Sequence, residues 1–97
     1  MSYKVFFIAK FKSPLAYEYR ELSKKIREVA EAQPGFIDIT SEEIDDIEIT
    51  VSTWRSKEDV YEWSKHPEHV NVKERSSEWY EWIRGIHINS SDEETLK

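Results

Sequence analysis

The chain has 97 residues, of which 38% are hydrophobic and 13% aromatic, and its formal net charge is −6 at pH 7. It contains no cysteine, which excludes disulfides, thiolate catalysis and iron–sulfur clusters, and the acidic balance argues against a nucleic-acid partner. No signal-peptide core or membrane-length apolar stretch stands in it, so we expect a cytoplasmic protein with no membrane partner. The apolar material is concentrated in large aromatic side chains, which suits a small fold with a pocket or an interface.

The first predicted elements are a strand and a helix. Residues 3–11 carry large apolar side chains at both odd and even positions, so this strand is apolar on both faces. Ser13 and Pro14 suit the N-cap and first turn of a helix, whose apolar stripe runs over residues 15–30. The sequence Gln-Pro-Gly at 33–35 ends this helix.

An antiparallel hairpin is predicted next. Residues 36–42 and 47–54 are rich in β-branched side chains and are separated by a short acidic turn. In the first of these strands, we expect Ile37 and Ile39 on one face and Phe36 on the other.

Two short helical stretches follow the hairpin. Ser56 and Asp59 have the spacing of a capping box and open the first of them. His66 and Pro67 interrupt this helix, and a second helical stretch is predicted over residues 67–76.

The last strand is predicted over residues 78–88, with Tyr80 and Trp82 on the same face. We find no internal repeat, linker or second domain. A single ferredoxin-like domain is therefore expected over residues 1–90, followed by a flexible acidic tail over 91–97.

This β-α-β-β-α-β order is that of a ferredoxin-like split β-α-β fold, an α+β class with a four-stranded antiparallel sheet. Both helical regions would cover one face of the sheet. The first and last strands nevertheless carry apolar side chains on both faces, so the other face would be an exposed apolar patch. The simplest cover is a second copy related by a two-fold axis, which predicts a homodimer through the sheet faces.

Four segments of the sequence resemble the antibiotic biosynthesis monooxygenase (ABM) domain family of the dimeric α+β barrel superfamily. In chain order they are Ala32-Gln33-Pro34-Gly35-Phe36, Trp54-Arg55-Ser56, residues 63–69, and Trp79-Tyr80. The likeness covers roughly residues 3–88. It implies two sheets packed into a barrel, and a pocket in each protomer between sheet and helices. It also implies cofactor-independent oxygenation or, in a related branch, haem degradation.

The resemblance and the side-chain chemistry together select candidate substrate-binding residues. Trp63 would line the pocket, although the same position also suits a core anchor. Tyr19 offers a hydroxyl that can orient a phenolic ligand, and Trp54 belongs to one of the matching segments. The candidate ligand is a small aromatic or hydrophobic molecule.

The candidate catalytic residues are His69, Arg75 and Tyr80. An unperturbed pKa near 6.5 suits His69 to proton transfer, although it could instead pack against Trp79 or Tyr80 or make a structural hydrogen bond. Arg75 could hold a substrate anion, or it could be a solvated charge at a helix end. His66 and His69 lie on a kinked segment and do not make a converging ligand set, so no metal is expected.

The function predicted from these residues is a cofactor-independent monooxygenase. Such an enzyme needs an apolar cavity, a group that helps deprotonate a phenol or enol, and donors that stabilise the resulting anion. Dioxygen then reacts with the anion itself, and no cofactor is expected. The alternative is a non-enzymatic module that binds a small ligand or a partner, because no phosphate loop, nucleophile elbow or paired carboxylates stand out.

Haem degradation is the less favoured enzymatic alternative. The related branch of the family pairs its pocket Trp with a downstream His and with an Asn on the first strand. Lys73 stands at the position of that His, and residues 3–11 contain no Asn.

Overall fold

The computed structural model describes residues 2–12 and 17–89 and follows the predicted order of elements. The second helical region is divided into two α-helices and a 3-10 turn, so the last strand begins later than predicted. The elements are β1 (Tyr3–Phe11), α1 (Tyr17–Glu31), β2 (Phe36–Ile44), β3 (Ile47–Trp54), α2 (Lys57–Ser64), α3 (Pro67–Glu74), η1 (Ser76–Glu78) and β4 (Tyr80–Asn89).

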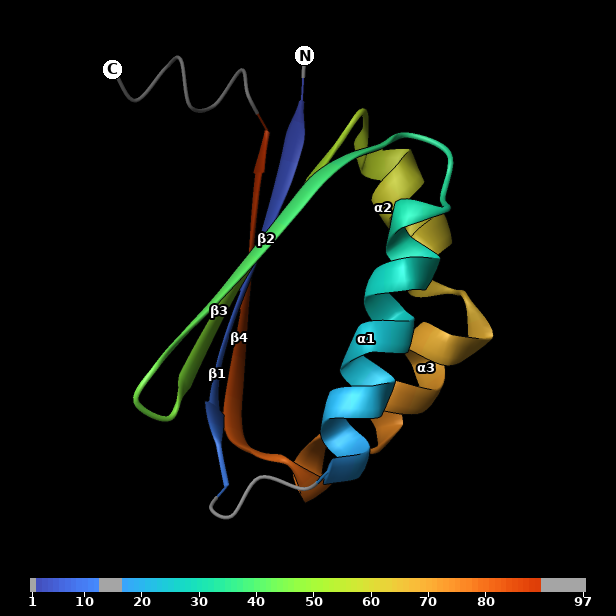
Figure 1. Cartoon of the computed structure of the whole chain (residues 1–97). Helices are drawn as coiled ribbons and strands as arrows, with labels where there is room; N and C mark the ends of the chain where they lie inside the picture. The colour runs from blue at the N-terminus through green and yellow to red at the C-terminus, as the bar shows by residue number, and fades with distance from the viewer. Residues whose placement is uncertain (1, 13–16, 90–97) are drawn as a thin grey trace, which may run out of the picture.

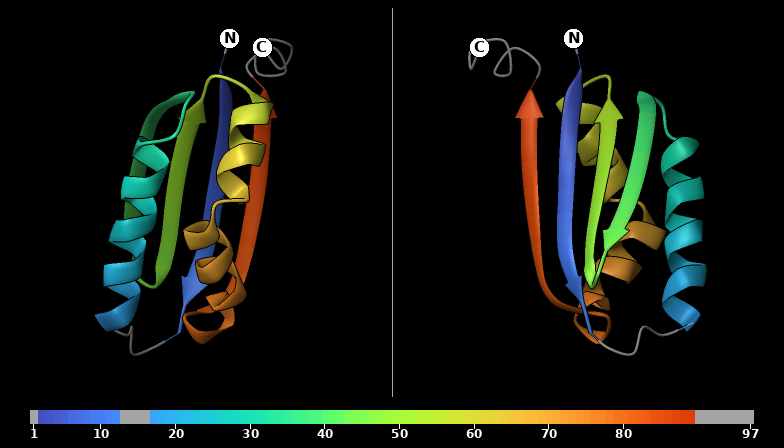
Figure 2. Two further views of the ribbon diagram at one scale, coloured as in Figure 1. Left: turned by 90° about the vertical axis from the view of Figure 1, so that its right-hand side faces the viewer. Right: turned by 60° about the vertical axis from the view of Figure 1, so that its left-hand side comes forward.

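The four strands form one antiparallel sheet in the order β2-β3-β1-β4, which confirms the predicted α+β, ferredoxin-like class. All helices lie on one face of this sheet (Figure 1), with α1 over the β2 side and α2 and α3 over the β1 and β4 side (Figure 2). Within the described ranges, no helix is both long and apolar enough to cross a lipid bilayer.

Helix α1 packs on the sheet through the predicted apolar stripe. Tyr19 and Ala30 are buried, and Leu22, Ile26 and Val29 are half-buried between them. This 3.6-residue periodicity is that of a helix with one face on a core. The predicted start of the helix at Ser13-Pro14 lies outside the described residues.

The predicted caps of the two short helices are confirmed. Ser56 is the N-cap of α2, and its hydroxyl accepts a hydrogen bond from the Asp59 backbone N–H at 3.3 Å. Pro67 is at the first turn of α3 and His66 is its N-cap, with Nδ1 accepting from the Glu68 backbone N–H at 3.1 Å. His66 therefore has a structural task that fixes its ring at the helix end.

A register shift just after Phe36 changes the predicted faces of β2. Phe36 lies opposite Trp54 and meets its ring edge-on at 5.6 Å, while Ile39 lies opposite Ser52 on the same face. Ile37 is exposed. The expectation that Phe36 points away from Ile39 was therefore wrong, because a bulge adds a residue and restarts the alternation.

A second register shift separates Tyr80 from Trp82. Phe11 pairs with Tyr80 while Lys10 pairs with Trp82, so Glu81 is an extra residue in β4. Tyr80 is buried under the helices, and Trp82 lies on the opposite, bare face. The predicted shared face for these two aromatics was wrong for the same reason.

Strand β3 turns its polar side toward the helices. Glu48 pairs with the fully buried Ala9, and both Glu48 and Ser52 are buried. The apolar side chains Ile49 and Val51 point to the other face. The core between sheet and helices therefore contains polar groups that an ordinary amphipathic strand would expose.

Among the described residues, no helix covers the other face of the sheet (Figure 2), and large apolar side chains lie on it. Trp82 and Ile86 on β4 are 43% and 47% exposed, and Phe6 and Ile8 on β1 lie beside them only half-buried. A contiguous apolar surface of this kind marks an interaction site.

Candidate functional site

Two aromatic clusters with polar atoms occupy the layer between the sheet and the helices. The first, here the tryptophan–histidine cluster, consists of Trp54, Trp63 and His69. The second, here the tyrosine–glutamate cluster, consists of Tyr19, Glu48 and Tyr80. They lie toward opposite ends of the strands, because Trp54 ends β3 and Glu48 is near its start.

The tryptophan–histidine cluster is a row of three rings in contact. Trp54 is fully buried and stacks on Trp63 of α2 with ring centroids 4.9 Å apart. His69 of α3 meets Trp63 edge-on at 4.5 Å. Pro67 makes this contact possible, because it ends α2 and starts a new helix that brings His69 back over Trp63.

Three buried nitrogens in this cluster lack hydrogen-bond partners. They are Nε1 of Trp54, Nε1 of Trp63 and Nδ1 of His69, for which no described residue provides a partner. Leaving such a group buried and unpaired costs about 1–3 kcal/mol, and native proteins contain few of them. The cluster is therefore suited to receive a polar group from a ligand or from water.

His69 is held in its neutral form. Burial lowers the pKa of His69 below its ordinary value of 6.5, and the positive charge of Lys73 acts in the same direction. A hydrogen bond between His69 and the Ser64 backbone acts in the opposite direction and raises the pKa, but its effect is weaker. At pH 7 the ring thus has one nitrogen that donates and one that accepts.

In contrast, the tyrosine–glutamate cluster is fully hydrogen-bonded. The Tyr19 hydroxyl donates to Oε1 of Glu48, and the Tyr80 hydroxyl donates to the Tyr19 oxygen at 2.7 Å. The Tyr80 hydroxyl also lies 3.3 Å from Oε2 of Glu48. Phe11 stacks on Tyr80 at 5.5 Å and, with Trp79 against Tyr19, closes the cluster from water.

Burial controls the protonation of this cluster. It raises the pKa of Glu48, and repulsion by Glu43 adds to the shift, while the hydrogen bonds from Tyr19 and Tyr80 oppose it. Burial, and then the charge of Glu48, raise the pKa of both tyrosines above their ordinary value of 10.0. Both phenols are therefore neutral donors at pH 7.

The two clusters are neighbours along α3 and β1. On α3, Val72 packs on the tyrosine–glutamate cluster one turn after His69, a rise of about 5 Å. On β1, Val5 packs on the tryptophan side and Phe7 on the tyrosine side. The two clusters therefore adjoin each other along α3 and β1.

Gly85 has open space beside it on edge strand β4. Gly85 pairs with Phe7 on the helix-covered face, and a Cβ atom added to it would meet no atom within 4 Å. Ile83 and His87, its neighbours on the same face of β4, are exposed. We call this open position on the exposed edge strand β4 the Gly85 space.

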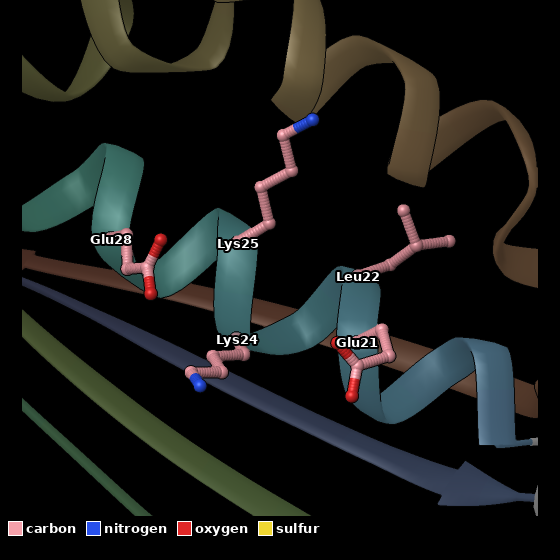
Figure 3. Close-up of a pocket in the computed structure, with 5 residues that line it drawn as sticks. All are labelled: Glu21, Leu22, Lys24, Lys25 and Glu28. Atoms are coloured by element: carbon pink, nitrogen blue, oxygen red, sulfur yellow. The ribbon is translucent and has the colours of Figure 1, made fainter.

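A separate hollow lies on the surface of α1, and one of its lining residues, Leu22, packs on the tyrosine–glutamate cluster. It has a volume of about 370 Å³ and is lined by Glu21, Leu22, Lys24, Lys25 and Glu28 (Figure 3). Leu22 and Lys25 point toward α3, where Lys25 pairs with Glu68 at 3.0 Å. Its open and charged walls do not suit a small aromatic ligand.

The predicted site residues are divided between these places. Trp54, Trp63 and His69 come together, and the ring against which His69 packs is Trp63. Tyr19 and Tyr80 meet in the other cluster. Arg75 belongs to neither: its Nε donates to Oε2 of Glu78 at 2.8 Å, and its guanidinium lies 5.1 Å from the Trp79 ring.

The described residues contain no group of three or more His, Cys, Asp or Glu side chains that could hold a metal ion. His66 and His69 are close in sequence, but His66 is engaged at the start of α3. These two histidines therefore do not form the beginning of a ligand set.

Sequence reasoning missed Glu48. Its place among Ile47, Ile49 and Thr50 in an alternating strand suggests a solvated carboxylate. The signal that could have found it was the predicted dimer. If the isoleucines of β3 face a second copy, the alternating Glu48 must face the helices.

A family model matches residues 6–89 of the chain. The chain belongs to the family described as Domain of unknown function (DUF3291). It is also 40% identical over 65 residues to the uncharacterized protein YqjZ of Bacillus subtilis. That alignment covers 65% of this chain and 57% of YqjZ, so it spans little more than half of the relative's length.

Solved structures with the same fold include three from bacteria. A protein of Nitrosomonas europaea described as a candidate antibiotic biosynthesis monooxygenase superposes with a TM-score of 0.81 at 12% identity, covering 91% of this chain and 88% of that chain. A Mycobacterium tuberculosis protein gives 0.82 at 13% identity, covering 92% and 94%. SnoaB of Streptomyces nogalater, a cofactor-independent oxygenase, gives 0.77 at 10% identity, covering 91% of each chain. The resemblance to the ABM domain is thereby confirmed for the fold.

Proposed function

We propose that the protein is a cofactor-independent monooxygenase acting on a small aromatic or hydrophobic substrate bound between the sheet and the helices. The observation that carries this proposal is the set of three buried, unpartnered nitrogens on Trp54, Trp63 and His69. The likeness of the fold to an oxygenase that needs no cofactor supports it. At these identities the likeness gives the scaffold, and the chemistry rests on the residues of this chain.

In this proposal the substrate enters through the Gly85 space. Its ring lies over Val5 and Phe7 beneath α3, with Trp63 as one wall. Nδ1 of the neutral His69 accepts a hydrogen bond from a substrate hydroxyl, and the indole N–H of Trp63 donates one to a substrate oxygen. At the other end, Tyr80 and then Tyr19 present the hydroxyls of the second cluster.

The reaction takes its electrons from the substrate. An electron-rich phenol or enol loses its proton, and the anion transfers electrons to dioxygen. A CH₂ carbon of the substrate becomes a carbonyl, so one oxygen atom enters the product and the other leaves as water. The protein supplies an apolar space, a proton acceptor and donors that stabilise the anion.

In this scheme Arg75 binds the substrate anion only if it first leaves its ion-pair partner Glu78. Its guanidinium is held by both carboxylate oxygens of Glu78, at 2.8 and 3.2 Å. To hold a substrate anion, it would have to exchange Glu78 for the substrate. Because the ion pair is partly exposed, this exchange would cost little.

A second copy of the chain is the proposed cover of the bare sheet face. Trp82, Ile86 and the neighbouring apolar residues of β1 and β3 form a flat apolar surface, and an identical surface is complementary to it across a two-fold axis. Light scattering after size exclusion should give the mass of a dimer. Ile86→Asp should shift it to that of a monomer, whereas Tyr61→Asp on the exposed side of α2 should not.

The function is tested with anthrone, an enolisable aromatic ketone, as the probe under labelled dioxygen. We expect enzyme-dependent oxygen uptake and a carbonyl product that carries one labelled atom. Trp63→Ala and His69→Ala should each lower the rate, and Tyr61→Ala should leave it unchanged. Saturable binding of anthrone without oxygen uptake would instead favour a ligand-binding module, and absence of both would contradict the proposal.

A further inference from the structure

Glu48 is a buried carboxyl group that no cation faces among the described residues. It is 7% exposed. The groups that face it are Tyr19 from α1, Tyr80 from β4 and Glu43 from β2, and from β1 it meets the methyl group of Ala9. The Thr50 side chain of β3 also hydrogen-bonds to it. Burying a carboxylate without a cation costs free energy, so the buried position of Glu48 needs an explanation other than stability.

The hydrogen bonds of this cluster run in one direction. An ionised carboxylate only accepts, so the proton of Tyr19 is committed to Glu48. The Tyr19 oxygen then accepts from Tyr80 at 2.7 Å. Tyr80 is therefore the outer end of the chain, and the lone pairs of its oxygen are the place where a further proton can be received.

The Tyr80 ring is linked to the Gly85 space through Phe7. The Tyr80 ring meets Phe7 edge-on at 5.6 Å, and Phe7 pairs with Gly85 on the same face of the sheet. Glu48 itself is shielded behind the two tyrosines. A substrate in the Gly85 space could thus approach Tyr80 without contacting the carboxylate.

We propose that Glu48 is the proton acceptor of the site, and that Tyr80 and Tyr19 conduct the substrate's proton to it. This inference rests on the proposed function and assigns its first step. The substrate O–H bond breaks and its proton binds the Tyr80 oxygen. The proton of Tyr80 moves to Tyr19, and that of Tyr19 moves to Oε1 of Glu48. No electrons are exchanged with the protein, and the products are a substrate anion and a neutral carboxylic acid.

The environment of Glu48 favours this step. A buried carboxylate binds a proton more tightly than an exposed one, so the transfer relieves the cost of its charge. Both phenols strongly resist ionisation, so they pass the proton on and do not keep a charge. An acceptor whose proton affinity is raised toward neutrality is suited to general base catalysis.

His69 is the competing acceptor, because its neutral imidazole can also take a proton. The two assignments differ in which variant abolishes ionisation of a bound phenol. Glu48→Gln removes the acceptor but keeps an oxygen for the Tyr19 hydroxyl, and Tyr80→Phe interrupts the chain but keeps the ring that packs on Phe11. His69→Gln removes the competing imidazole.

The experiment uses 4-nitrophenol, whose neutral and ionised forms absorb differently. It is done on the full chain at a pH below the pKa of the free probe, so that any phenolate marks proton transfer within the complex. We expect phenolate on the unaltered protein. Its ratio to the neutral form should fall at least about tenfold, equivalent to about one pKa unit, in Glu48→Gln and in Tyr80→Phe.

Matched controls are Glu28→Gln and Tyr61→Phe, which remove an exposed carboxylate and an exposed phenol. Both should behave as the unaltered protein, and circular dichroism should show that every variant is folded. Binding with unchanged ionisation in Glu48→Gln, or loss of ionisation in His69→Gln alone, would overturn the inference and leave the proposed function standing. Failure of the probe to bind the unaltered protein would count against both.

Discussion

The two clusters between sheet and helices are built from similar rings but differ in how their polar atoms are paired. In the tyrosine–glutamate cluster, each hydroxyl donates to a partner and the carboxylate accepts from both phenols. In the tryptophan–histidine cluster, three buried nitrogens have no partner among the described residues. One cluster is therefore fully paired within the chain, whereas the other leaves three buried donors or acceptors unpaired among the described residues.

This difference separates two tasks that are often assigned to a single pocket. In the proposed function the unpaired cluster binds a polar aromatic molecule, because its three nitrogens have no partner among the described residues. In the further proposal the paired cluster moves a proton, because its hydrogen bonds form a directed chain that ends on a carboxylate. The Gly85 space adjoins Phe7, which packs on the tyrosine–glutamate cluster.

The largest expected effect is on stability at the tryptophan–histidine cluster. Trp54→Ala should lower the free energy of unfolding by about 3–5 kcal/mol, because the side chain is fully buried and leaves a cavity. Urea unfolding measures this change, and Tyr61→Ala on the exposed side of α2 should change stability by less than about 0.5 kcal/mol. A loss of under about 1 kcal/mol would mean that the Trp54 side chain contributes little to the stability of the core.

The next effect tests the completeness of the tyrosine–glutamate cluster. Tyr19→Phe keeps the ring but removes the donor to Glu48 and the acceptor for Tyr80. The free energy of unfolding should fall by about 1–3 kcal/mol. Tyr3→Phe, which removes a part-buried hydroxyl bonded to His87 at 3.0 Å, is the matched control. If both variants lose the same amount of unfolding free energy, the hydrogen bonds of the tyrosine–glutamate cluster stabilise the fold no more than the Tyr3–His87 hydrogen bond does.

The contribution of Glu48 to the free energy of unfolding should fall as the pH rises. Its folded pKa is raised above the ordinary 4.5, so the folded state keeps this proton to higher pH than the unfolded state. The stabilising contribution is complete below pH 4.5 and is lost as the pH rises through the raised pKa. Subtracting the unfolding free energies of Glu48→Gln from those of the unaltered protein at several pH values isolates it. A difference that grows with pH would contradict the shift.

The contribution of His69 to the free energy of unfolding should instead fall as the pH falls, and by a smaller amount. Its folded pKa is lowered below 6.5, so its contribution is present above pH 6.5 and is lost as the pH falls through the lowered value. The same subtraction with His69→Gln should therefore give a difference that declines toward acid. An NMR titration of the His69 ring checks the pKa directly, and a value above 6.5 would refute the assignment of a buried, neutral ring.

The sequence predicted the elements well because local signals set them. Alternation gave β1 and β3, and the caps at Ser56 and Pro67 gave the short helices. Where it failed, a bulge was the cause: one extra residue near Phe36 and another at Glu81 exchanged the faces of the side chains around them. Nothing in the local pattern of residue types marks these insertions.

The candidate site was predictable only in part. Trp54, Trp63 and His69 were selected from the resemblance and do come together. Glu48 was missed, because the side of β3 that faces the helices is decided by what covers the other side of the sheet. Arg75 was placed by its position near a helix end, whereas its ion pair with Glu78 depends on the turn that follows.

The most direct test of a ligand site at the unpaired cluster uses the four tryptophans of the chain as reporters. Trp54 and Trp63 mark that cluster, Trp79 packs against Tyr19 in the paired cluster, and Trp82 marks the bare face. Nitrogen-15 NMR gives one indole N–H signal for each, and 4-nitrophenol is added to saturation. The Trp63 signal should move the most while that of Trp82 stays in place. A shifted Trp82 with an unmoved Trp63 would contradict the site.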